Sequence, residues 1–233
     1  MRLDLHVHTC YSYDCALSLE KLSAVVRRKG LDGVAILDHD EIEGALRLRE
    51  WAPFKVIVGE EIGTMHGGIA ALFIEEHIPP HLSAEETIAR IREQKGLVFI
   101  PHPLARGVPG KIEERKLYEI IEQIDVLEGY NARAPFAADD QRARELAARY
   151  GLPVAAGSDG HFACEIGRAW TEMDNFQTPQ EFLANLQRAR LHYTTKTPYL
   201  VPALTVASIA PLTAWRLLRQ IIIRRKQGVR DAH

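Results

Sequence analysis

Short apolar runs alternate with longer amphipathic segments along most of the chain. The short runs have the length and the β-branched content of strands, whereas the longer segments carry apolar residues at helical spacing. The predicted strands are 2–7, 33–37, 55–58, 69–74, 97–100, 126–128 and 153–156. The predicted helices are 18–29, 42–51, 83–94, 113–123, 138–150 and 179–190. Strand followed by helix, repeated this often, predicts a parallel α/β fold.

Residues at the segment ends agree with these assignments. Ser83 is a favoured helix N-cap, and Glu86 three residues later completes a capping box. Gly30 and Gly151 each follow a helical run, where a left-handed residue commonly ends a helix. The helix starts and stops therefore support the pattern of apolar positions.

The domain organisation and compartment follow from composition. No linker rich in Pro, Gly or Ser divides the chain, so we expect one domain over residues 1–197 and a tail over 198–233. With 46% hydrophobic and 26% charged residues, wholesale disorder is excluded. A formal net charge of -2 argues against duplex nucleic acid as a partner. Three cysteines and no secretory signal lead us to expect a cytoplasmic protein.

Candidate chemistry begins in the first predicted strand. Asp4, His6 and His8 should share one face, and the apolar residues at positions 3, 5 and 7 the other, because side chains alternate along a strand. Two imidazoles at a strand end can reach one metal ion. Taken alone, such a motif is also compatible with a surface histidine pair.

The same residue types recur after later apolar runs. The runs near residues 37, 58, 100 and 156 lead into Asp38-His39-Asp40, Glu60-Glu61, His102 and Asp159-Gly160-His161. In a parallel sheet or barrel, ligands and catalytic residues come from these carboxyl ends. Because five of the ten histidines lie in these motifs, we predict a metal site at the meeting point of the strand ends.

The motifs, in this order, resemble those of the polymerase and histidinol phosphatase (PHP) family, and most closely its metal-dependent phosphoesterase branch. The resemblance rests on His6-Val7-His8-Thr9, Asp38-His39-Asp40, His102-Pro103, Gly157-Ser158-Asp159-Gly160-His161 and Glu128-Gly129-Tyr130-Asn131-Ala132-Arg133. It covers residues 1–197. It implies a distorted seven-stranded (β/α)7 barrel, similar to a TIM barrel, with two or three divalent metal ions at its mouth.

Carried over position by position, the resemblance implies a specific set of ligands. One ion would be held by His6, His8, Glu61 and Asp159. Glu61 would bridge to a second ion that takes His102, and a third position would take Asp14, His39 and His161. Imidazole and carboxylate in similar numbers suit Mn²⁺, Fe²⁺ or Zn²⁺.

Several nearby residues are assigned less directly. Glu60 is a rival to Glu61, although the Gly-x-Glu-Ile pattern favours Glu61. Gly68 stands where the family often carries His or Glu, so the second ion's ligands depart from the family pattern. His66 is either a substitute ligand or a solvent-facing turn residue. Asp4, Asp38 and Glu128 are expected to support the ligands.

The expected activity is hydrolysis of a phosphate mono- or diester by attack of metal-bridged hydroxide. Asp159, His161 and His39 are the expected catalytic residues. The expected phosphate-binding residues are Arg106, Arg133 and Arg168, because each follows a site motif and guanidinium groups pair well with phosphate. For each arginine, a surface ion pair with a nearby acid is the alternative.

The substrate stays open at this stage. A small nucleotide, a short oligonucleotide and a phosphorylated metabolite such as histidinol phosphate are all compatible with the resemblance, with the last ranked lowest. The alternative to an enzyme is a non-catalytic metal-binding PHP domain with a role in binding or assembly. Degenerate domains of that kind should lose several ligand positions, whereas here only Gly68 departs from the pattern.

The tail has a character of its own. From Leu200 onward it carries six Lys or Arg and one Asp. Its apolar and basic residues follow a pattern that predicts an amphipathic helix. It could pack on the barrel, lie on an anionic membrane surface, or contact a partner or a nucleic-acid backbone. The sequence does not distinguish these interpretations, and it leaves the oligomeric state open.

Overall fold

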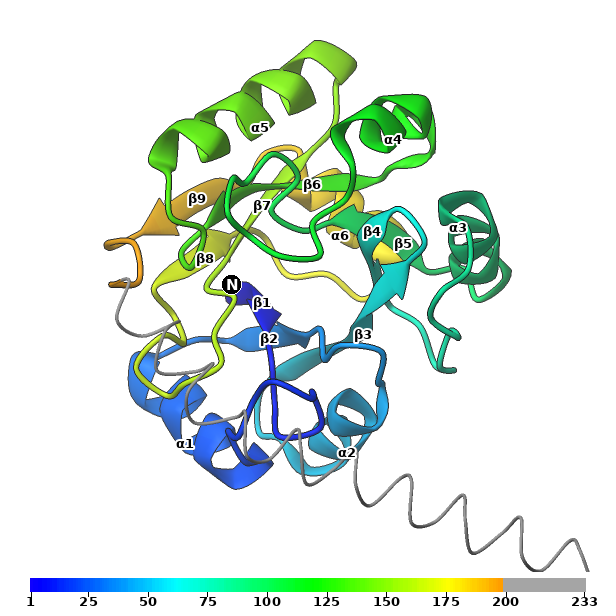
Figure 1. The fold of residues 1–233 in the computed structure, drawn as a ribbon. Helices are drawn as coiled ribbons and strands as arrows, with labels where there is room; N and C mark the ends of the chain where they lie inside the picture. The colour runs from blue at the N-terminus through cyan, green and yellow to red at the C-terminus, as the bar shows by residue number, and fades with distance from the viewer. Residues whose placement is uncertain (199–233) are drawn as a thin grey trace, which may run out of the picture.

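The computed structural model describes residues 1–198, and the predicted tail helix lies outside the described residues (Figure 1). Its strands form one sheet that curves into a nearly closed barrel. The strands are β1 (Arg2–Val7), β2 (Gly33–Ile36), β3 (Lys55–Thr64), β4 (Gly67–Leu72), β5 (Leu97–Ile100), β6 (Val126–Asn131), β7 (Val154–Gly157), β8 (Ala169–Glu172) and β9 (Arg190–Tyr193). The α/β class expected from the alternating pattern is confirmed.

Within residues 1–198 the sheet contains nine strands in the order β7-β6-β5-β4-β3-β2-β1-β8-β9, whereas the family resemblance implied seven. Neighbours run parallel from β1 to β3 and again from β5 to β7. The antiparallel strand β4 lies between these two sets, and the antiparallel hairpin β8–β9 extends the sheet beyond β1. A parallel bridge between Val7 and Gly160 brings the two sides of the barrel together.

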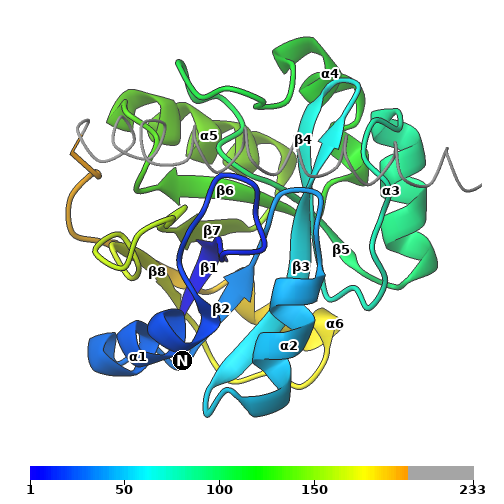
Figure 2. The same cartoon turned by 60° about the horizontal axis from the view of Figure 1, so that its bottom comes forward.

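The helices lie mostly on the outside of the sheet, as Figure 2 shows for α1, α2, α3 and α5. They are α1 (Leu19–Lys29), α2 (Glu43–Trp51), α3 (Ala84–Glu93), α4 (Glu114–Glu119), α5 (Ala137–Tyr150) and α6 (Pro179–Leu186). A 3-10 turn at Ile121–Gln123 completes the segment predicted as helix 113–123. The capping box of Ser83 and Glu86 is present. Among the described residues, no helix combines the length and apolar character that crossing a bilayer requires.

The two larger apolar clusters of the described residues hold these layers together. Inside the barrel, Leu5 and Phe99 pack with Phe182 of α6, which closes the end opposite the strand carboxyl ends. Outside the sheet, Val7 and Ile36 pack against the helices. Leu5 and Val7 therefore lie on opposite sides of the sheet.

This difference corrects the predicted alternation of β1. Positions 3, 5 and 7 do not share one face, because the pairing of β1 with β2 is irregular between Asp4 and Val7. Such an irregularity moves the later residues of a strand to the other face. As a result, Val7 faces the helices while His6 packs edge-on against Phe99 of the barrel interior.

Other boundaries also differ from the prediction. β3 continues past residue 58 to Thr64, because its second half pairs with β4 in a hairpin. Glu61 is therefore inside a strand and does not follow one. The segment predicted as helix 179–190 ends at Leu186, and β9 begins at Arg190. The strands β8 and β9 were missed because each has four residues, many of them polar and partly exposed.

Gly157 permits the close approach of β7 to β1. A methyl group at this position would lie 2.3 Å from Cβ of His6 and 2.7 Å from its backbone nitrogen. We predict that Gly157→Ala destabilises the protein by about 1–3 kcal/mol, since rigid backbone must shift to admit the methyl group.

Thermal unfolding monitored by circular dichroism tests this prediction. Gly63→Ala is the control, because a methyl group there would meet no atom closer than 3.4 Å. Equal melting temperatures for Gly157→Ala and the wild type would contradict the close-approach argument.

Candidate metal centre

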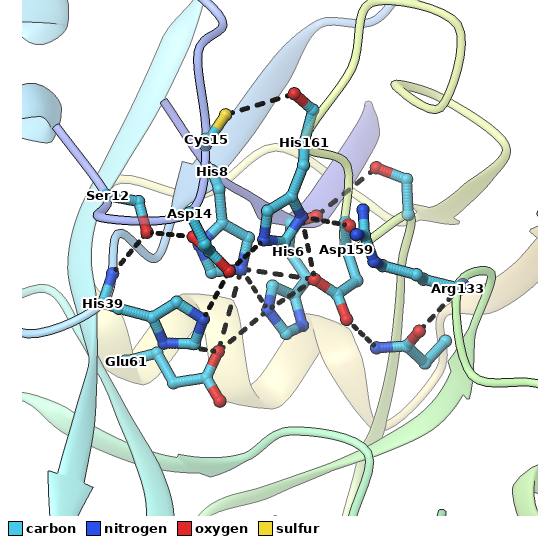
Figure 3. A network of polar contacts seen from close by, with 12 residues as sticks. His6, His8, Ser12, Asp14, Cys15, His39, Glu61, Arg133, Asp159 and His161 are labelled. Atoms are coloured by element: carbon cyan, nitrogen blue, oxygen red, sulfur yellow. Dashed lines mark hydrogen bonds and ion pairs between the residues drawn. The ribbon is translucent and has the colours of Figure 1, made fainter. Parts of the chain in front are cut away.

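One end of the barrel gathers the ionisable residues singled out in the sequence (Figure 3). Because the parallel strands all point to this end, residues distant in sequence converge there. The group comprises His6, His8, Asp14, His39, Glu61, His102, Asp159 and His161. They come from β1, β3 and the loops that follow β1, β2, β5 and β7.

The deepest group is formed by His6, His8 and Glu61. The Nε2 atoms of the two histidines are 3.1 Å apart. Oε2 of Glu61 lies 3.3 Å from Nε2 of His6 and 3.8 Å from Nε2 of His8. Oδ1 of Asp159 lies 3.6 and 3.3 Å from the same two nitrogens. The four residues expected to hold one ion are thus brought together.

These donors fit a divalent cation. Oε2 of Glu61 is buried and makes no hydrogen bond with the described residues. Ligand atoms around a tetrahedral ion stand roughly 3.4 Å apart, given metal–ligand bonds of about 2.1 Å. The spacings between Glu61 or Asp159 and the two histidines bracket this value. Shared coordination would satisfy an oxygen that is otherwise costly to bury.

A second group lies nearer to the opening and contains Asp14, His39 and His161 together with His8. Oδ2 of Asp14 is 2.9 Å from Nε2 of His161 and 3.4 Å from Nε2 of His39. Nδ1 of His161 donates to the backbone oxygen of Asp159 over 2.9 Å, which turns Nε2 toward Asp14. The sequence placed His8 in the first group only, whereas the structure places it in both.

His102 faces the other oxygen of Glu61, with 3.4 Å between Nε2 and Oε1. Glu61 therefore has imidazoles at both of its oxygens, as a bridging carboxylate requires. A Cβ at Gly68 would lie 2.9 Å from Oε1, so a side chain at this position would stand beside the same oxygen. His66 is not in either group; its Nδ1 accepts a hydrogen bond from the backbone of Ala84.

Backbone conformation at the strand ends helps to aim these side chains. His102 and Asp159 have left-handed φ angles of 33° and 52°. Asp40, in the loop after β2, has a φ of 52° and accepts a hydrogen bond from the backbone of Gly63. Left-handed conformations cost energy in non-glycine residues and gather at functional sites. Their presence here agrees with a site whose geometry is enforced by the fold.

Buried carboxylates support the ligands from behind. Nδ1 of His6 donates to Oε1 of Glu128 over 3.1 Å, and the backbone of His102 donates to Oε2 over 2.7 Å. Asp38 accepts two bonds from Thr9. Contacts of this kind orient metal-binding imidazoles in known sites. They agree with the supporting role expected for Glu128.

Asp4 ties β1 to the loop after β7. It accepts hydrogen bonds of 2.8 Å from the backbone nitrogens of Ser158 and Gly167. Burial raises the pKa of Asp4 to about 6, although these bonds oppose the shift. The aspartate therefore holds the segment that delivers Asp159, in agreement with its expected supporting role.

The electrostatics of the mouth are dominated by close opposite charges. Burial lowers the pKa of His39, but the carboxylates of Glu61 and Asp14 outweigh it and raise the pKa to about 9. Burial raises the pKa of Glu61 and of Asp159, but neighbouring imidazoles outweigh it and bring both well below their usual range. Burial, and after it the nearby imidazole of His161, lower the pKa of His8 to about 3.

The three candidate phosphate-binding arginines differ in their surroundings. Arg133 pairs with the buried carboxylate of Glu165 at 3.0 Å, and its backbone N–H donates to Asn131, whose amide bonds to Asp159. Arg106 pairs with Asp139 at 2.9 Å and is largely exposed. The Arg106–Asp139 pair is the surface ion pair that the alternative interpretation anticipated, whereas the Arg133–Glu165 pair is largely buried.

Arg168 makes no bond to the metal-binding group among the described residues. Its guanidinium donates to the Cys164 carbonyl and to the hydroxyl of Thr195. Asn131 is a residue that the sequence did not assign to the centre. It is buried and donates to both Glu128 and Asp159. Its place within the Glu128–Arg133 motif was the only available signal.

We predict that metal binding releases protons and tightens as the pH rises. In the metal-free protein, carboxylates raise the pKa of His39 to about 9 and hold those of His6 and His102 above their usual value against burial. Protonated imidazoles must lose their protons to bind an ion, and a higher pH makes this loss cheaper.

Calorimetric titration with Mn²⁺ near pH 6 and near pH 8, in buffers of different ionisation enthalpy, measures both effects. The expected result is a lower Kd at the higher pH and a measured binding enthalpy that depends on the ionisation enthalpy of the buffer. A Kd that does not change with pH would contradict the prediction.

Comparison with known proteins agrees with this geometry. A PHP domain model matches residues 4–131, more than half of the chain, and a PHP-associated model matches residues 139–191. An uncharacterized protein of Methanocaldococcus jannaschii is 32% identical over 193 residues, which are 78% of each chain.

Two solved structures share the fold. One is a proposed metal-dependent phosphoesterase from Bifidobacterium adolescentis, with a TM-score of 0.58, 20% identity and coverage of 69% of this chain and 88% of that one. The other is a two-domain protein from Bacteroides vulgatus with a proposed PHP-like phosphoesterase, with a TM-score of 0.65, 18% identity and coverage of 83% and 64%. The matched models and the 32% identical relative show that the chain belongs to the PHP domain family.

Proposed function

We propose that this protein is a metal-dependent phosphoesterase that hydrolyses a phosphate mono- or diester. The observation that carries the proposal is the convergence of five imidazoles and three carboxylates on one mouth of the barrel, around the buried carboxylate of Glu61. Surfaces that only bind a partner have no need of so many buried ionisable groups in mutual contact. The names of the structural relatives point to the same activity.

The ligand set would hold two or three divalent ions. His6, His8, Glu61 and Asp159 would hold the first, and Glu61 would share its second oxygen with an ion at His102. Bound divalent ions of this kind lower the pKa of a water molecule and neutralise phosphate oxygens. The mixture of nitrogen and oxygen donors favours Mn²⁺, Fe²⁺ or Zn²⁺.

The second group, nearer to the opening of the mouth, has a different proposed role. Nε2 of His39 and Nε2 of His161 both face Oδ2 of Asp14 at the opening of the mouth. A carboxylate shared by two imidazoles can hold a third ion or keep a proton ready for the leaving oxygen of the ester. We assign catalytic roles to His161 and His39 on this basis, and to Asp159 because it faces His6 and His8 in the first group.

Arg133 is the arginine we assign to the phosphate. Its backbone N–H donates to Asn131, whose amide bonds to Asp159, and its partner Glu165 also accepts the backbone N–H of His161 over 2.9 Å. Arg133 is thus held on the loop that carries the ligands. Arg106 would have to leave Asp139 to reach a substrate, and Arg168 is bonded to Cys164 and Thr195.

A small nucleotide or short oligonucleotide is the substrate class we favour. Three exposed apolar side chains stand on loops at the mouth: Tyr13 at 51% exposure, Met65 at 67% and Phe136 at 42%. The Tyr13 ring stacks on His39, with 5.0 Å between centroids and 24° between planes. Exposed aromatic rings beside a phosphate site are suited to stacking on a nucleobase.

Glu61→Gln should abolish metal-dependent hydrolysis, with kcat/KM lower by about 100-fold or more, because one charged ligand is lost. The assay measures phosphate or nucleotide release with Mn²⁺ from a panel of substrates. The panel holds a generic monoester, a generic diester, a nucleoside bisphosphate, short RNA and DNA oligomers and histidinol phosphate.

Glu60→Gln is the matched control for this assay. Glu60 precedes Glu61 on β3, but its buried carboxylate points away from the barrel interior. It accepts hydrogen bonds from Nδ1 of His77 and from the backbone N–H of Ile78. This variant should keep its activity. Stoichiometric bound Mn²⁺ with no hydrolysis of any panel member would favour the alternative, a non-catalytic binding domain.

Tyr13→Ala should raise KM for the nucleotide substrate roughly fivefold or more, because stacking on a base is lost. It should leave the kinetics of a small phosphate monoester unchanged. Tyr150→Ala is the control, since Tyr150 is similarly exposed at the far end of α5. Equal effects of Tyr13→Ala on both substrates would remove the support for a nucleotide.

A further inference from the structure

The last described segment of the chain is fastened to the end of β6 and to the loop that follows it. The Tyr193 ring stacks on Tyr130, with 4.1 Å between centroids and 12° between planes. The backbone nitrogen of Thr197 donates to the carbonyl of Ala132 over 2.7 Å. Residues that precede the tail are therefore in direct contact with the segment that carries Asn131.

Lys196 makes the central contact of this segment. Its Nζ donates to the carbonyl oxygen of Asn131 over 2.7 Å and forms an ion pair with the carboxylate of Asp140. The ammonium also lies 4.3 Å from the ring centroid of Tyr130. Oδ1 of Asp140 accepts the backbone N–H of Asn131 over 3.3 Å. The Lys196–Asp140 pair thus holds both backbone polar groups of Asn131.

The side chain of Asn131 is fully engaged in turn. Its Nδ2 donates to Oε2 of Glu128 over 2.9 Å and to Oδ2 of Asp159 over 3.2 Å. Its Oδ1 accepts the backbone N–H groups of Arg133 and Ala134 over 2.9 and 2.8 Å. An amide can donate to two acceptors and accept two bonds, and all four possibilities are used here.

The position of this amide has a consequence for the metal-binding residues. Bonding Oδ2 of Asp159 to the amide leaves Oδ1 facing His6 and His8, at 3.6 and 3.3 Å. Bonding Oε2 of Glu128 leaves Oε1 for Nδ1 of His6. The amide also separates two buried carboxylates, which would otherwise repel each other.

We propose that Asn131 is a positioning residue for the metal centre and that Lys196, through Asp140 and the backbone of Asn131, fixes it in place. The inference rests on the metal centre of the proposed function but not on any particular substrate. It connects the C-terminal segment to His6, through Asn131 and Glu128.

The first test compares two lysine variants of the full chain, Lys196→Met and Lys55→Met. Lys55 is a matched control because its Nζ also donates to a carbonyl, that of Phe176, and lies 4.0 Å from the Phe176 ring centroid. It begins β3, at the opposite end of the barrel. Melting temperatures report the structural cost of each change, and calorimetric titration with Mn²⁺ reports the centre.

Lys196→Met should weaken Mn²⁺ binding about tenfold, the effect typical of a lost supporting contact, whereas Lys55→Met should leave it unchanged. Lys196→Arg, which keeps the charge opposite Asp140, should recover most of the affinity. Equal losses of affinity in Lys196→Met and Lys55→Met would overturn the positioning role, as would unchanged affinity in Lys196→Met.

The second test removes the amide itself. Asn131→Asp replaces two donors with a third negative charge between Glu128 and Asp159, so Mn²⁺ binding should weaken about 10- to 100-fold. The electron paramagnetic resonance spectrum of the bound Mn²⁺ should change as well. Asp140→Asn, which keeps the size of the side chain, serves as the second variant if Asn131→Asp does not fold, and it should weaken binding about as much as Lys196→Met does.

The outcomes also separate this inference from the proposed function. Normal Mn²⁺ binding in Asn131→Asp would overturn the role of the amide, and normal binding in Asp140→Asn would overturn the link to Lys196. A wild type that binds no Mn²⁺ would overturn the centre and this inference together. If the wild type binds Mn²⁺ but hydrolyses no ester while Lys196→Met weakens binding selectively, the positioning role is supported and the phosphoesterase proposal is not.

Discussion

The buried carboxylate of Glu61 is the group whose charge the surrounding side chains of the barrel mouth must compensate. Its Oε2 faces His6, His8 and His39, and its Oε1 faces His102. A carboxylate buried in this way is costly unless several partners compensate its charge. The ends of β1, β2 and β5 must therefore reach β3 with imidazoles in place, and the barrel is the arrangement that brings them there.

Local irregularities of the backbone make this convergence possible. The irregular pairing in β1 turns His6 into the barrel while Val7 stays among the outer apolar residues. Left-handed conformations at His102 and Asp159 redirect the chain at two strand ends. Gly157 allows β7 to approach His6 more closely than any residue with a side chain would. Each deviation costs stability, and each stands at or next to a residue of the candidate metal-binding group.

Behind the ligands lies a layer of polar residues that is just as deeply buried. Glu128 and Asn131 are almost entirely inaccessible to solvent, and their hydrogen bonds lead outward to Asp140 and Lys196. A buried polar network holds its geometry only when every member is satisfied. Asp159 is therefore connected, through Asn131, to residues that lie outside the candidate metal-binding group.

Features fixed by residues close together in sequence were predictable, whereas features fixed by contacts between distant segments were not. Helix and strand segments such as 83–94 and 97–100 follow from apolar spacing and caps, which are local properties of the sequence. β8 and β9 escaped prediction because their four-residue sequences carry no such spacing and are stabilised by pairing with β1 and with each other. The same holds for β3 beyond residue 58, whose partner is the neighbouring strand β4.

For the centre, the sequence by itself determined which residue types end the strands and, through the order of the motifs, the family to which the chain belongs. Only the tertiary structure decided that His8 lies in both groups, that Glu61 points inward while Glu60 points outward, and that the amide of Asn131 bonds to Glu128 and Asp159. The reason is physical. A strand's alternation can be reversed by a single irregularity, and the partners of a buried carboxylate come from segments up to a hundred residues or more away, which no local pattern specifies.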